Sequence, residues 1–334
     1  MKDFIAQLPK AELHVHLEGA VTPEFWLKLI KKHQPDNTLT LDQLKKRFVY
    51  NSFPDFLETF RDVVFSFYNA DDLYDLTATF LNQSADQNVR YCEVMFTPYF
   101  LIKRGLDYHD MMAEIVRAAK ETERKRGIEM KLIFDGPRNF GNKVVRELFE
   151  LAANDRTGHV VGVGLGGDEK SFPARDFQNE FQFAEAHGLK TIAHAGETAG
   201  TRSIIDTITL LNVSRIGHGL GIIENSDVES LIFDRNITLD LCPGSNVKTR
   251  SINSLNEHPL KNYLERGYSV TLNSDDPGLF SSTLNNEYLA MAKICSLSPD
   301  QITQIAINSI NGSFLPQSRK RQLIDEIDAF AKSP

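Results

Sequence analysis

Eight short apolar runs, rich in β-branched residues, recur along this 334-residue chain and alternate with stretches of helical pattern. This alternation is typical of repeated βα units around a parallel sheet. Eight units predict a closed (β/α)8 TIM barrel, whose usual size range includes this length. The predicted strands are residues 12–17, 89–96, 130–134, 160–165, 190–194, 215–218, 237–241 and 269–272.

A doubly wound open sheet is the structural alternative to the barrel. Such a sheet needs a glycine-rich phosphate turn after its first strand. The sequence at this point, Leu17-Glu18-Gly19-Ala20, is not such a turn. We therefore expect the closed barrel.

A long inserted segment separates the first two predicted strands. It covers about residues 23–85, and its pattern predicts several helices packed over one end of the barrel. Two roles stay open for this helical insertion: it stabilises the barrel, or it acts as a lid over a substrate. Further helices are predicted over 108–126, 174–187, 203–211 and 259–266 and after Ser298, so residues 1–334 are expected to form a single domain.

Composition narrows the class of partner. The formal net charge of −8 argues against nucleic acid, because binding a phosphate backbone usually needs a basic surface. No apolar run is long enough for a membrane span or a signal peptide, so we expect a cytoplasmic protein that binds a small molecule. The scattered cysteines Cys92, Cys242 and Cys295 have no CxxC spacing, so buried free thiols are expected. These features leave the oligomeric state open.

Two histidines alternate with apolar residues in the first predicted strand, Leu13-His14-Val15-His16-Leu17. Because successive side chains of a strand point to opposite faces, His14 and His16 share one face. A strand with this pattern can present two nitrogen ligands to a metal side by side. The pattern also arises easily by chance, so other parts of the chain have to support it.

Other ionisable side chains follow the ends of three later strands. His194 and Glu197 lie at the end of the fifth predicted strand, His218 ends the sixth, and Asp275 and Asp276 follow the eighth. In a barrel these ends converge on one rim, where such folds place their active sites. Singly, each residue has a structural explanation as a core histidine, a helix cap or a first-turn carboxylate. Together they are costly to bury unless a cation or dense hydrogen bonding compensates them.

Four of these side chains make a candidate metal site: His14, His16, His194 and Asp275. Three imidazole nitrogens and one carboxylate suit zinc, one ion per chain, with a position left for water. Zinc would lower the pKa of that water toward about 7 and so provide a hydroxide nucleophile. Glu197 suits proton transfer, and His218 can be a ligand, a base or the group that orients the water.

Five short motifs resemble those of the adenosine deaminase family and come in that family's order. They are Pro-Lys-Ala-Glu-Leu-His-Val-His-Leu-Glu-Gly-Ala at 9–20, Gly-Gly-Asp-Glu at 166–169, His-Ala-Gly-Glu at 194–197, Arg-Ile-Gly-His-Gly at 215–219 and Ser-Asp-Asp-Pro at 274–277. Each motif is short, but the set is highly specific. The similarity extends from about residue 8 to about residue 290.

This resemblance implies that the enzyme uses zinc to remove the 6-amino group of an adenine-type nucleoside, giving the 6-oxo base and ammonia. By analogy with the family, Glu197 passes a proton to ring N1 and His218 orients the hydroxide. Asp276 would hydrogen-bond N7, and the backbone N–H of Gly167 would face N3. The implied zinc ligands are His14, His16, His194 and Asp275. The expected substrate-binding residues are His16, Glu18, Gly167 and Asp276, and the expected catalytic residues are Glu197, His218 and Asp275.

Glu18 departs from the pattern of the adenosine deaminases of animals and many bacteria. Those enzymes have His-Leu-Asp-Gly, with the aspartate on the ribose 5′-hydroxyl, whereas this chain has the longer glutamate. Adenine deaminases of the family also carry the glutamate. At the positions of residues 215–219, however, they have a motif like Arg-Ile-Asp-His-Gly, whereas this chain has Gly217 in place of the aspartate, which favours a nucleoside substrate. Branches that act on 5′-modified adenosines, including aminodeoxyfutalosine, pair the glutamate with a Gly-Leu-Gly-Gly stretch like residues 164–167. All three substrate classes stay open.

Two alternatives belong to other classes of protein. One is a catalytically silent purine-binding protein that has kept the fold, although all the matched chemical positions are intact. The other is a barrel hydrolase that cleaves cyclic amides or phosphoesters. Such sites commonly use two metals, often bridged by a carboxylated lysine, and neither Lys131 nor Lys190 lies where that bridge is expected. We therefore favour a single zinc ion.

Overall fold

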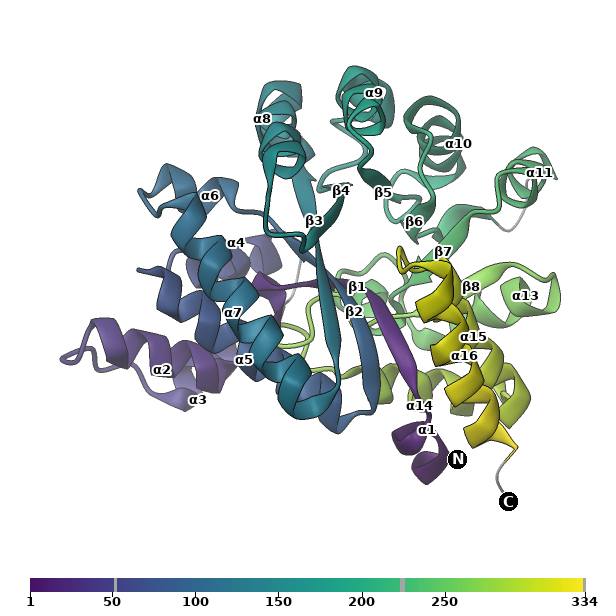
Figure 1. The fold of residues 1–334 in the computed structure, drawn as a ribbon, viewed down its shortest axis with the longest axis horizontal. Coiled ribbons are helices and arrows are strands. Elements are labelled where there is room, and N and C mark those ends of the chain that lie inside the picture. Colours follow the sequence, from purple (N-terminus) through teal and green to yellow (C-terminus); the bar gives the residue numbers. More distant parts are fainter. Residues whose placement is uncertain (51–52, 223–225, 333–334) are drawn as a thin grey trace.

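The computed structural model describes residues 1–50, 53–222 and 226–332. Its centre is a sheet of eight parallel strands in the order β1 to β8, with helices around it (Figure 1). The first strand meets the segment that follows the last strand at a bridge between Val15 and Asp275. There the His16 N–H donates to the Asp275 carbonyl at 2.8 Å, and the Asp275 N–H donates to the His14 carbonyl at 3.2 Å. The predicted (β/α)8 TIM barrel is confirmed.

All eight predicted strands are present. Three of them match their predicted bounds, and the others begin or end within a few residues of them. The third strand continues past Phe134, because its pairing with the fourth extends to Pro137 and Gly166. The strands are β1 (Lys10–His16), β2 (Val89–Phe96), β3 (Glu129–Pro137), β4 (Val160–Gly166), β5 (Lys190–Ala195), β6 (Arg215–His218), β7 (Thr238–Leu241) and β8 (Ser269–Leu272).

Helices fill the chain between β1 and β2, as predicted. Side-chain caps set where most of them begin: Thr22 accepts from the Phe25 N–H, and Thr40 and Asn69 each start a capping box. The last helix of this insertion packs on α7 (Tyr108–Arg126), the long helix before β3 (Figure 1). The inserted helices are η1 (Glu18–Ala20), α2 (Pro23–His33), α3 (Leu41–Arg47), α4 (Phe53–Val64) and α5 (Ala70–Asp86).

The remaining helices surround the barrel or close its ends. The predicted helix over 174–187 is divided in two, because the backbone of Phe177 leaves the helical region at φ −116°. The predicted C-terminal helices are present, with Pro316 between them. The helices are α1 (Lys2–Gln7), α6 (Tyr99–Lys103), α7 (Tyr108–Arg126), η2 (Arg138–Phe140), α8 (Gly141–Asn154), η3 (Ala174–Phe177), α9 (Gln178–Ala186), α10 (Gly200–Leu211), η4 (Leu220–Ile222), α11 (Ser226–Asp234), α12 (Pro243–Lys248), η5 (Leu255–Glu257), α13 (Leu260–Glu265), α14 (Leu284–Cys295), α15 (Pro299–Gly312) and α16 (Gln317–Ala331).

A buried arginine links three strands inside the barrel. Arg215 of β6 is fully buried, and its Nη1 lies 2.6 Å from Glu93 Oε2 of β2. Its Nε lies 2.7 Å from Asp240 Oδ2 of β7, and its Nη2 donates to the Leu13 carbonyl of β1 at 3.2 Å. One guanidinium thereby compensates two buried carboxylates, which the apolar interior would otherwise exclude.

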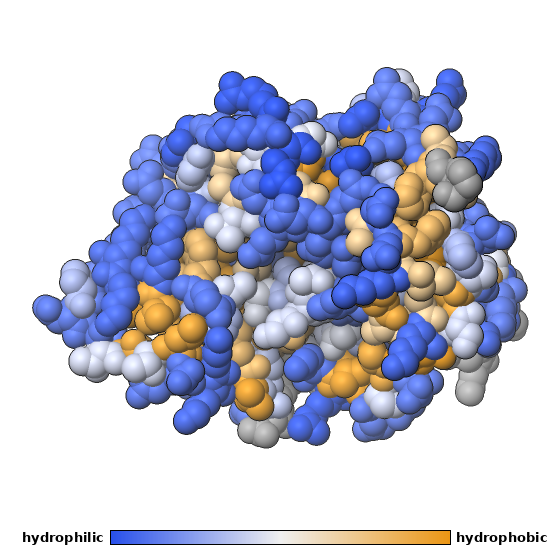
Figure 2. Space-filling model, turned by 90° about the horizontal axis from the view of Figure 1, so that it is seen from below, coloured by the Kyte–Doolittle hydropathy of each residue, from blue (hydrophilic) through white to orange (hydrophobic). Residues whose placement is uncertain are grey.

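The face shown in Figure 2 is mostly hydrophilic, and its apolar residues gather in separate patches. The two ends of the described chain lie side by side (Figure 1), where the rings of Phe4 and Phe330 are 5.2 Å apart. All three cysteines are buried and free, as expected. Within the described ranges, no helix has both the length and the apolar character needed to cross a membrane.

We expect Arg215→Met to lower the free energy of unfolding by about 3–5 kcal/mol, because it leaves two buried carboxylates without a cation. Urea unfolding followed by circular dichroism measures this change. The control is Lys45→Ala, which removes an exposed ion pair with Glu24 and should cost less than about 1 kcal/mol. Equal stability of the two variants would show that the arginine is not needed for the barrel interior.

Candidate metal centre and active site

Five ionisable side chains from β1, β5, β6 and the segment after β8 meet at one rim of the barrel. His14 Nε2 and His16 Nε2 each lie 3.4 Å from Asp275 Oδ1, and His218 Nε2 lies 3.9 Å from Asp275 Oδ2. The ring centroids of His14 and His194 are 4.6 Å apart. His14, His194, His218 and Asp275 offer ligand atoms within 4.8 Å of one another. All the predicted metal ligands therefore meet at one place, with His218 beside them.

The chemistry of this cluster fits a cation. His14, His194, His218 and Asp275 are all buried, and both ring nitrogens of His14 and Nδ1 of His194 have no hydrogen-bond partner. Burial holds the pKa of His194 well below its usual value and lowers the pKa of His16 to about 4. Their imidazoles are therefore neutral near pH 7, the form that binds a metal. Neutral imidazoles around a carboxylate suit one divalent metal, and the assignment of His16 as a ligand stays a prediction.

Two glycines have no side chain at points where His14 and Asp276 lie close to the backbone. A Cβ at Gly217 would lie 2.4 Å from Cε1 of His14, and a Cβ at Gly19 would lie 1.9 Å from Oδ1 of Asp276. His218 and Asp275 themselves have positive φ angles of 67° and 63°, in a backbone region that residues other than glycine rarely adopt. Backbone strain of this kind is concentrated at functional sites.

Glu197 lies beside the cluster and is positioned by two hydroxyl groups. Thr249 Oγ1 and Ser251 Oγ each donate to Glu197 Oε1 at 3.2 Å. The other carboxylate oxygen lies 3.7 Å from His218 Nε2. The side-chain amide of Asn246 on α12 lies 3.0 Å from His218 Nδ1 and so fixes the orientation of the ring. The carboxyl group of Glu197 and Nε2 of His218 therefore lie next to each other in the site.

A buried carboxylate holds the loop that carries Glu197. Glu169 accepts hydrogen bonds from the three consecutive backbone N–H groups of residues 196–198, at 2.8 to 3.2 Å, and from the hydroxyl of Ser203 at 2.5 Å. Arg138 Nη2 donates to the carbonyl of His194 at 2.8 Å, just before this loop. Hydrogen bonds from Arg138 and to Glu169 therefore hold the end of β5 and the following turn, which carries Glu197.

The cluster forms the floor of a cavity of about 510 Å³, a size suited to a small molecule. Polar side chains surround the floor, whereas apolar side chains, several of them exposed, form the outer wall. The inserted helix α4 supplies much of that outer wall, so the insertion contributes directly to the cavity. The apolar residues that line it are Phe56, Leu57, Phe60, Val64, Phe65, Phe100, Pro137 and Phe140.

The predicted substrate-binding residues differ in their exposure to this cavity. His16, Gly167 and Asp276 line it, and Oδ1 of Asp276 has no hydrogen-bond partner. Glu18 is buried behind the wall, where its Oε1 accepts from the Thr97 N–H at 2.9 Å. Burial raises the pKa of Glu18 to about 7. Its contact with a sugar stays a prediction.

Sequence reasoning missed several residues of the site. Asn246, Thr249 and Ser251 follow β7, and common amides and hydroxyls in a loop give no signal of their own. Glu169 lies within a quoted motif, but nothing in the motif shows that its carboxylate accepts backbone hydrogen bonds. Asp135 lines the cavity because β3 extends beyond its predicted end.

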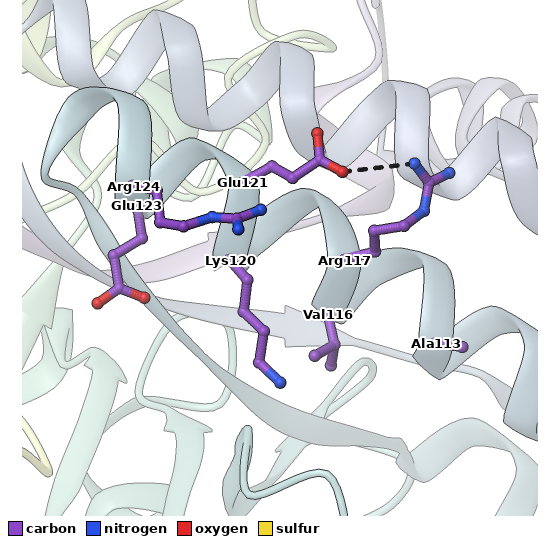
Figure 3. A pocket seen from close by; sticks show the side chains of 7 residues that line it. All are labelled: Ala113, Val116, Arg117, Lys120, Glu121, Glu123 and Arg124. Carbon is purple, nitrogen blue, oxygen red and sulfur yellow. Dashed lines mark ion pairs between the residues drawn. The ribbon is translucent and has the colours of Figure 1, made fainter.

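A second, shallow hollow lies on the outside of the barrel along α7 (Figure 3). All the side chains that line it come from this one helix, and Arg117 pairs with Glu121 at 3.6 Å. Charged residues four apart on an exposed helix face commonly pair in this way. This hollow has no cluster of imidazoles or buried carboxylates, so we place the chemistry in the barrel cavity.

A cluster of imidazoles and carboxylates at the C-terminal rim of a (β/α)8 barrel is typical of metal-dependent hydrolases. The family model described as adenosine deaminase matches residues 9–330. The chain therefore belongs to the adenosine deaminase family, as the sequence motifs predict.

Two similar curated proteins are both named as deaminases. The aminodeoxyfutalosine deaminase of Streptomyces avermitilis is 36% identical over 334 residues, which covers 99% of this chain and 93% of the relative. The adenine deaminase of Hahella chejuensis is 33% identical over 334 residues and covers 100% of both chains. The chain is a hydrolytic enzyme that acts on the C–N bond of a cyclic amidine.

Solved structures agree with this assignment. The adenine deaminase of Arthrobacter aurescens has a TM-score of 0.92 at 29% identity, covering 98% of this chain and all of that one. An amidohydrolase from Burkholderia ambifaria, solved with bound Zn, has a TM-score of 0.89 at 25% identity, covering 99% of this chain and 93% of that one. The similarity extends over the whole barrel in both cases.

We expect Asn246→Ala to lower kcat by about 10- to 100-fold, because the His218 ring loses the group that orients it. Metal content should stay at the wild-type value, and ammonia release together with elemental analysis measures both quantities. Asn154→Ala, on the exposed end of α8, is the control and should leave kcat unchanged. An active Asn246→Ala enzyme would mean that the ring is held by other contacts.

Proposed function

We propose that this enzyme hydrolytically removes the 6-amino group of adenosine or of a 5′-modified adenosine, with one zinc ion per chain, giving the 6-oxo product and ammonia. The observation that carries this proposal is the position of Glu197, beside His218 and the metal-ligand cluster on the floor of a cavity that fits a small molecule. A proton donor and a group that orients water are therefore close to the same metal site, as hydrolytic deamination needs.

The residues present can hold zinc and divide the remaining work between them. We assign His14, His16, His194 and Asp275 as ligands, because three nitrogens and one carboxylate leave a position open for water. Bound zinc supplies Lewis-acid activation of that water.

Glu197 delivers a proton to ring N1 of the substrate, and its two hydroxyl donors keep the carboxyl group in place. His218 orients the attacking water from the side of Glu197. Asp276 lines the cavity and hydrogen-bonds N7. The Gly167 N–H faces N3. Together these contacts present C6 of the purine to the floor of the cavity.

A nucleoside is our first choice of substrate. The adenine deaminases of the family have a motif like Arg-Ile-Asp-His-Gly, with an aspartate at the position of Gly217. In this chain Gly217 packs directly against the ring of His14, which leaves no room for a side chain. The second candidate is aminodeoxyfutalosine, because the relative named for that substrate is 36% identical to this chain. Adenine is the third, supported by the similarity to the adenine deaminases.

A substrate panel tests the proposal. Ammonia release is measured with adenosine, 5′-deoxyadenosine, methylthioadenosine, aminodeoxyfutalosine and adenine. We expect the highest kcat/KM with a nucleoside. Turnover of adenine alone would overturn the nucleoside assignment, and the absence of ammonia from every compound would favour a purine-binding protein without catalysis.

We expect Glu197→Gln to retain zinc but to lose at least about a hundredfold in kcat, the usual scale for a general acid. The glutamine keeps the size of the side chain and its contacts with Thr249 and Ser251, but it cannot deliver the proton. Steady-state kinetics and metal analysis of the same preparation measure the two properties. Full activity of this variant would contradict the proton-transfer role.

Metal content separates the roles of the two histidines that flank the cluster. His16→Ala should bind less than one zinc ion per chain, because it removes a ligand, whereas His218→Ala should keep the metal and lose turnover. Inductively coupled plasma mass spectrometry after dialysis measures the stoichiometry. The opposite result would make His218 the ligand and His16 the group that faces the substrate.

A further inference from the structure

The cavity wall formed by β3 contains a carboxyl group that the mechanism does not use. Asp135 lines the cavity and is only 5% exposed, and its Oδ1 has no hydrogen-bond partner. Its backbone is held in place, because the Asp135 carbonyl accepts from Thr97 Oγ1 at 3.1 Å. A buried carboxyl oxygen without a donor is costly, so its presence in a cavity calls for an explanation.

Two glycines of β4 make the room that this carboxyl group occupies. A Cβ at Gly164 would lie 2.6 Å from Asp135 Oδ1, and a Cβ at Gly166 would lie 2.6 Å from Asp135 Oδ2. Any other residue at either position would displace the carboxyl group. The Gly-Leu-Gly pattern of β4 therefore sets where the side chain of Asp135 lies, across the strand and beside the cavity.

The charges around Asp135 leave it without a cation of its own. Burial raises its pKa to about 8, opposed by Arg138 and reinforced by Glu18 and Asp275. Arg138 donates from Nη1 and Nη2 to the backbone carbonyls of Leu165, Phe172 and His194, and its Nε has no hydrogen-bond partner. Among the described residues, no side chain forms an ion pair or a hydrogen bond with the Asp135 carboxyl group. Because Asp135 lines the cavity, a ligand there can hydrogen-bond its carboxyl group.

We propose that Asp135 is a specificity-determining residue that hydrogen-bonds a sugar hydroxyl of the nucleoside substrate. The inference rests on the proposed function and identifies the residue that recognises the sugar. Glu18, which the family pattern assigns to this contact, lies behind the wall, whereas Asp135 lines the cavity itself. Asp135 is therefore the carboxyl group on this wall that a sugar can reach directly.

Charge argues against the other substituents that a purine can carry. A phosphate group bound here would need a cation, and the one arginine that lines the cavity, Arg61, is largely exposed and paired with Asp62 among the described residues. An apolar group placed against Asp135 would leave its carboxyl group without a hydrogen-bond partner. A neutral hydroxyl group satisfies it without adding charge.

The test compares a nucleoside with the free base in the same variants. Asp135→Ala should lower kcat/KM for adenosine by about 10- to 100-fold, the range for leaving a buried hydroxyl group without its partner, and leave kcat/KM for adenine within a factor of about two. If adenine is not turned over, the inhibition constants of purine and purine riboside give the same comparison. The matched control is Glu180→Gln, because Glu180 on α9 is a buried carboxyl group with an unpartnered oxygen that does not line the cavity.

A second variant moves the carboxyl group without removing it. Gly164→Ala places a methyl group against Asp135 Oδ1 and should reproduce the loss for the nucleoside. In the Asp135→Ala background the same change should have no further effect, because the group it displaces is gone. Analogues locate the hydroxyl: among 2′-, 3′- and 5′-deoxyadenosine, the one that lacks the bonded hydroxyl should be insensitive to Asp135→Ala.

Two outcomes would overturn the inference while the proposed function stands. One is an equal loss for adenine and adenosine, which would assign Asp135 to the chemistry or the fold. The other is wild-type kcat/KM for adenosine in Asp135→Ala. A wild-type enzyme that releases ammonia from adenine alone would instead refute the nucleoside function itself, and the inference with it.

Discussion

The barrel closes where β1 meets the segment after β8, and the same contact builds the metal site. The backbone groups of His14 and His16 bond to those of Asp275, so one closing contact brings two imidazoles and a carboxylate together. Their relative positions follow from the pairing of main-chain atoms rather than from flexible side chains. The site is therefore arranged before a cation arrives, which reduces the reorganisation needed when it binds.

Buried carboxyl groups inside the barrel and at its rim have different partners. Inside the barrel, Glu93 and Asp240 are compensated by Arg215, a cation that belongs to the chain. At the rim, Asp275 faces imidazoles, while Asp135 and Asp276 each keep an oxygen without a partner. The interior charges serve the fold, and the rim leaves acceptors for molecules that come from outside.

Much of this arrangement could be predicted because apolar runs mark the strands and chemistry follows their ends. His194, His218 and Asp275 lie at or just after the ends of apolar runs, and their recurrence at separate strands indicates a shared rim. Supporting residues give no comparable signal: Asn246 is one amide on the short helix α12, and its role depends on the ring of His218, which lies on another strand. Asp135 was hidden for another reason. The Asp-Gly-Pro that ends β3 has the composition of a turn, yet the pairing with β4 continues through it.

The outer wall of the cavity and its floor come from different parts of the chain. Strand ends make the floor, whereas α4 of the insertion supplies Phe56, Leu57 and Phe60 to the wall. Substitutions in this helix can reshape the entrance while the reacting groups stay as they are. The substrate can therefore change in evolution while the chemistry is kept. Two relatives, each about a third identical to this chain, are named for different substrates.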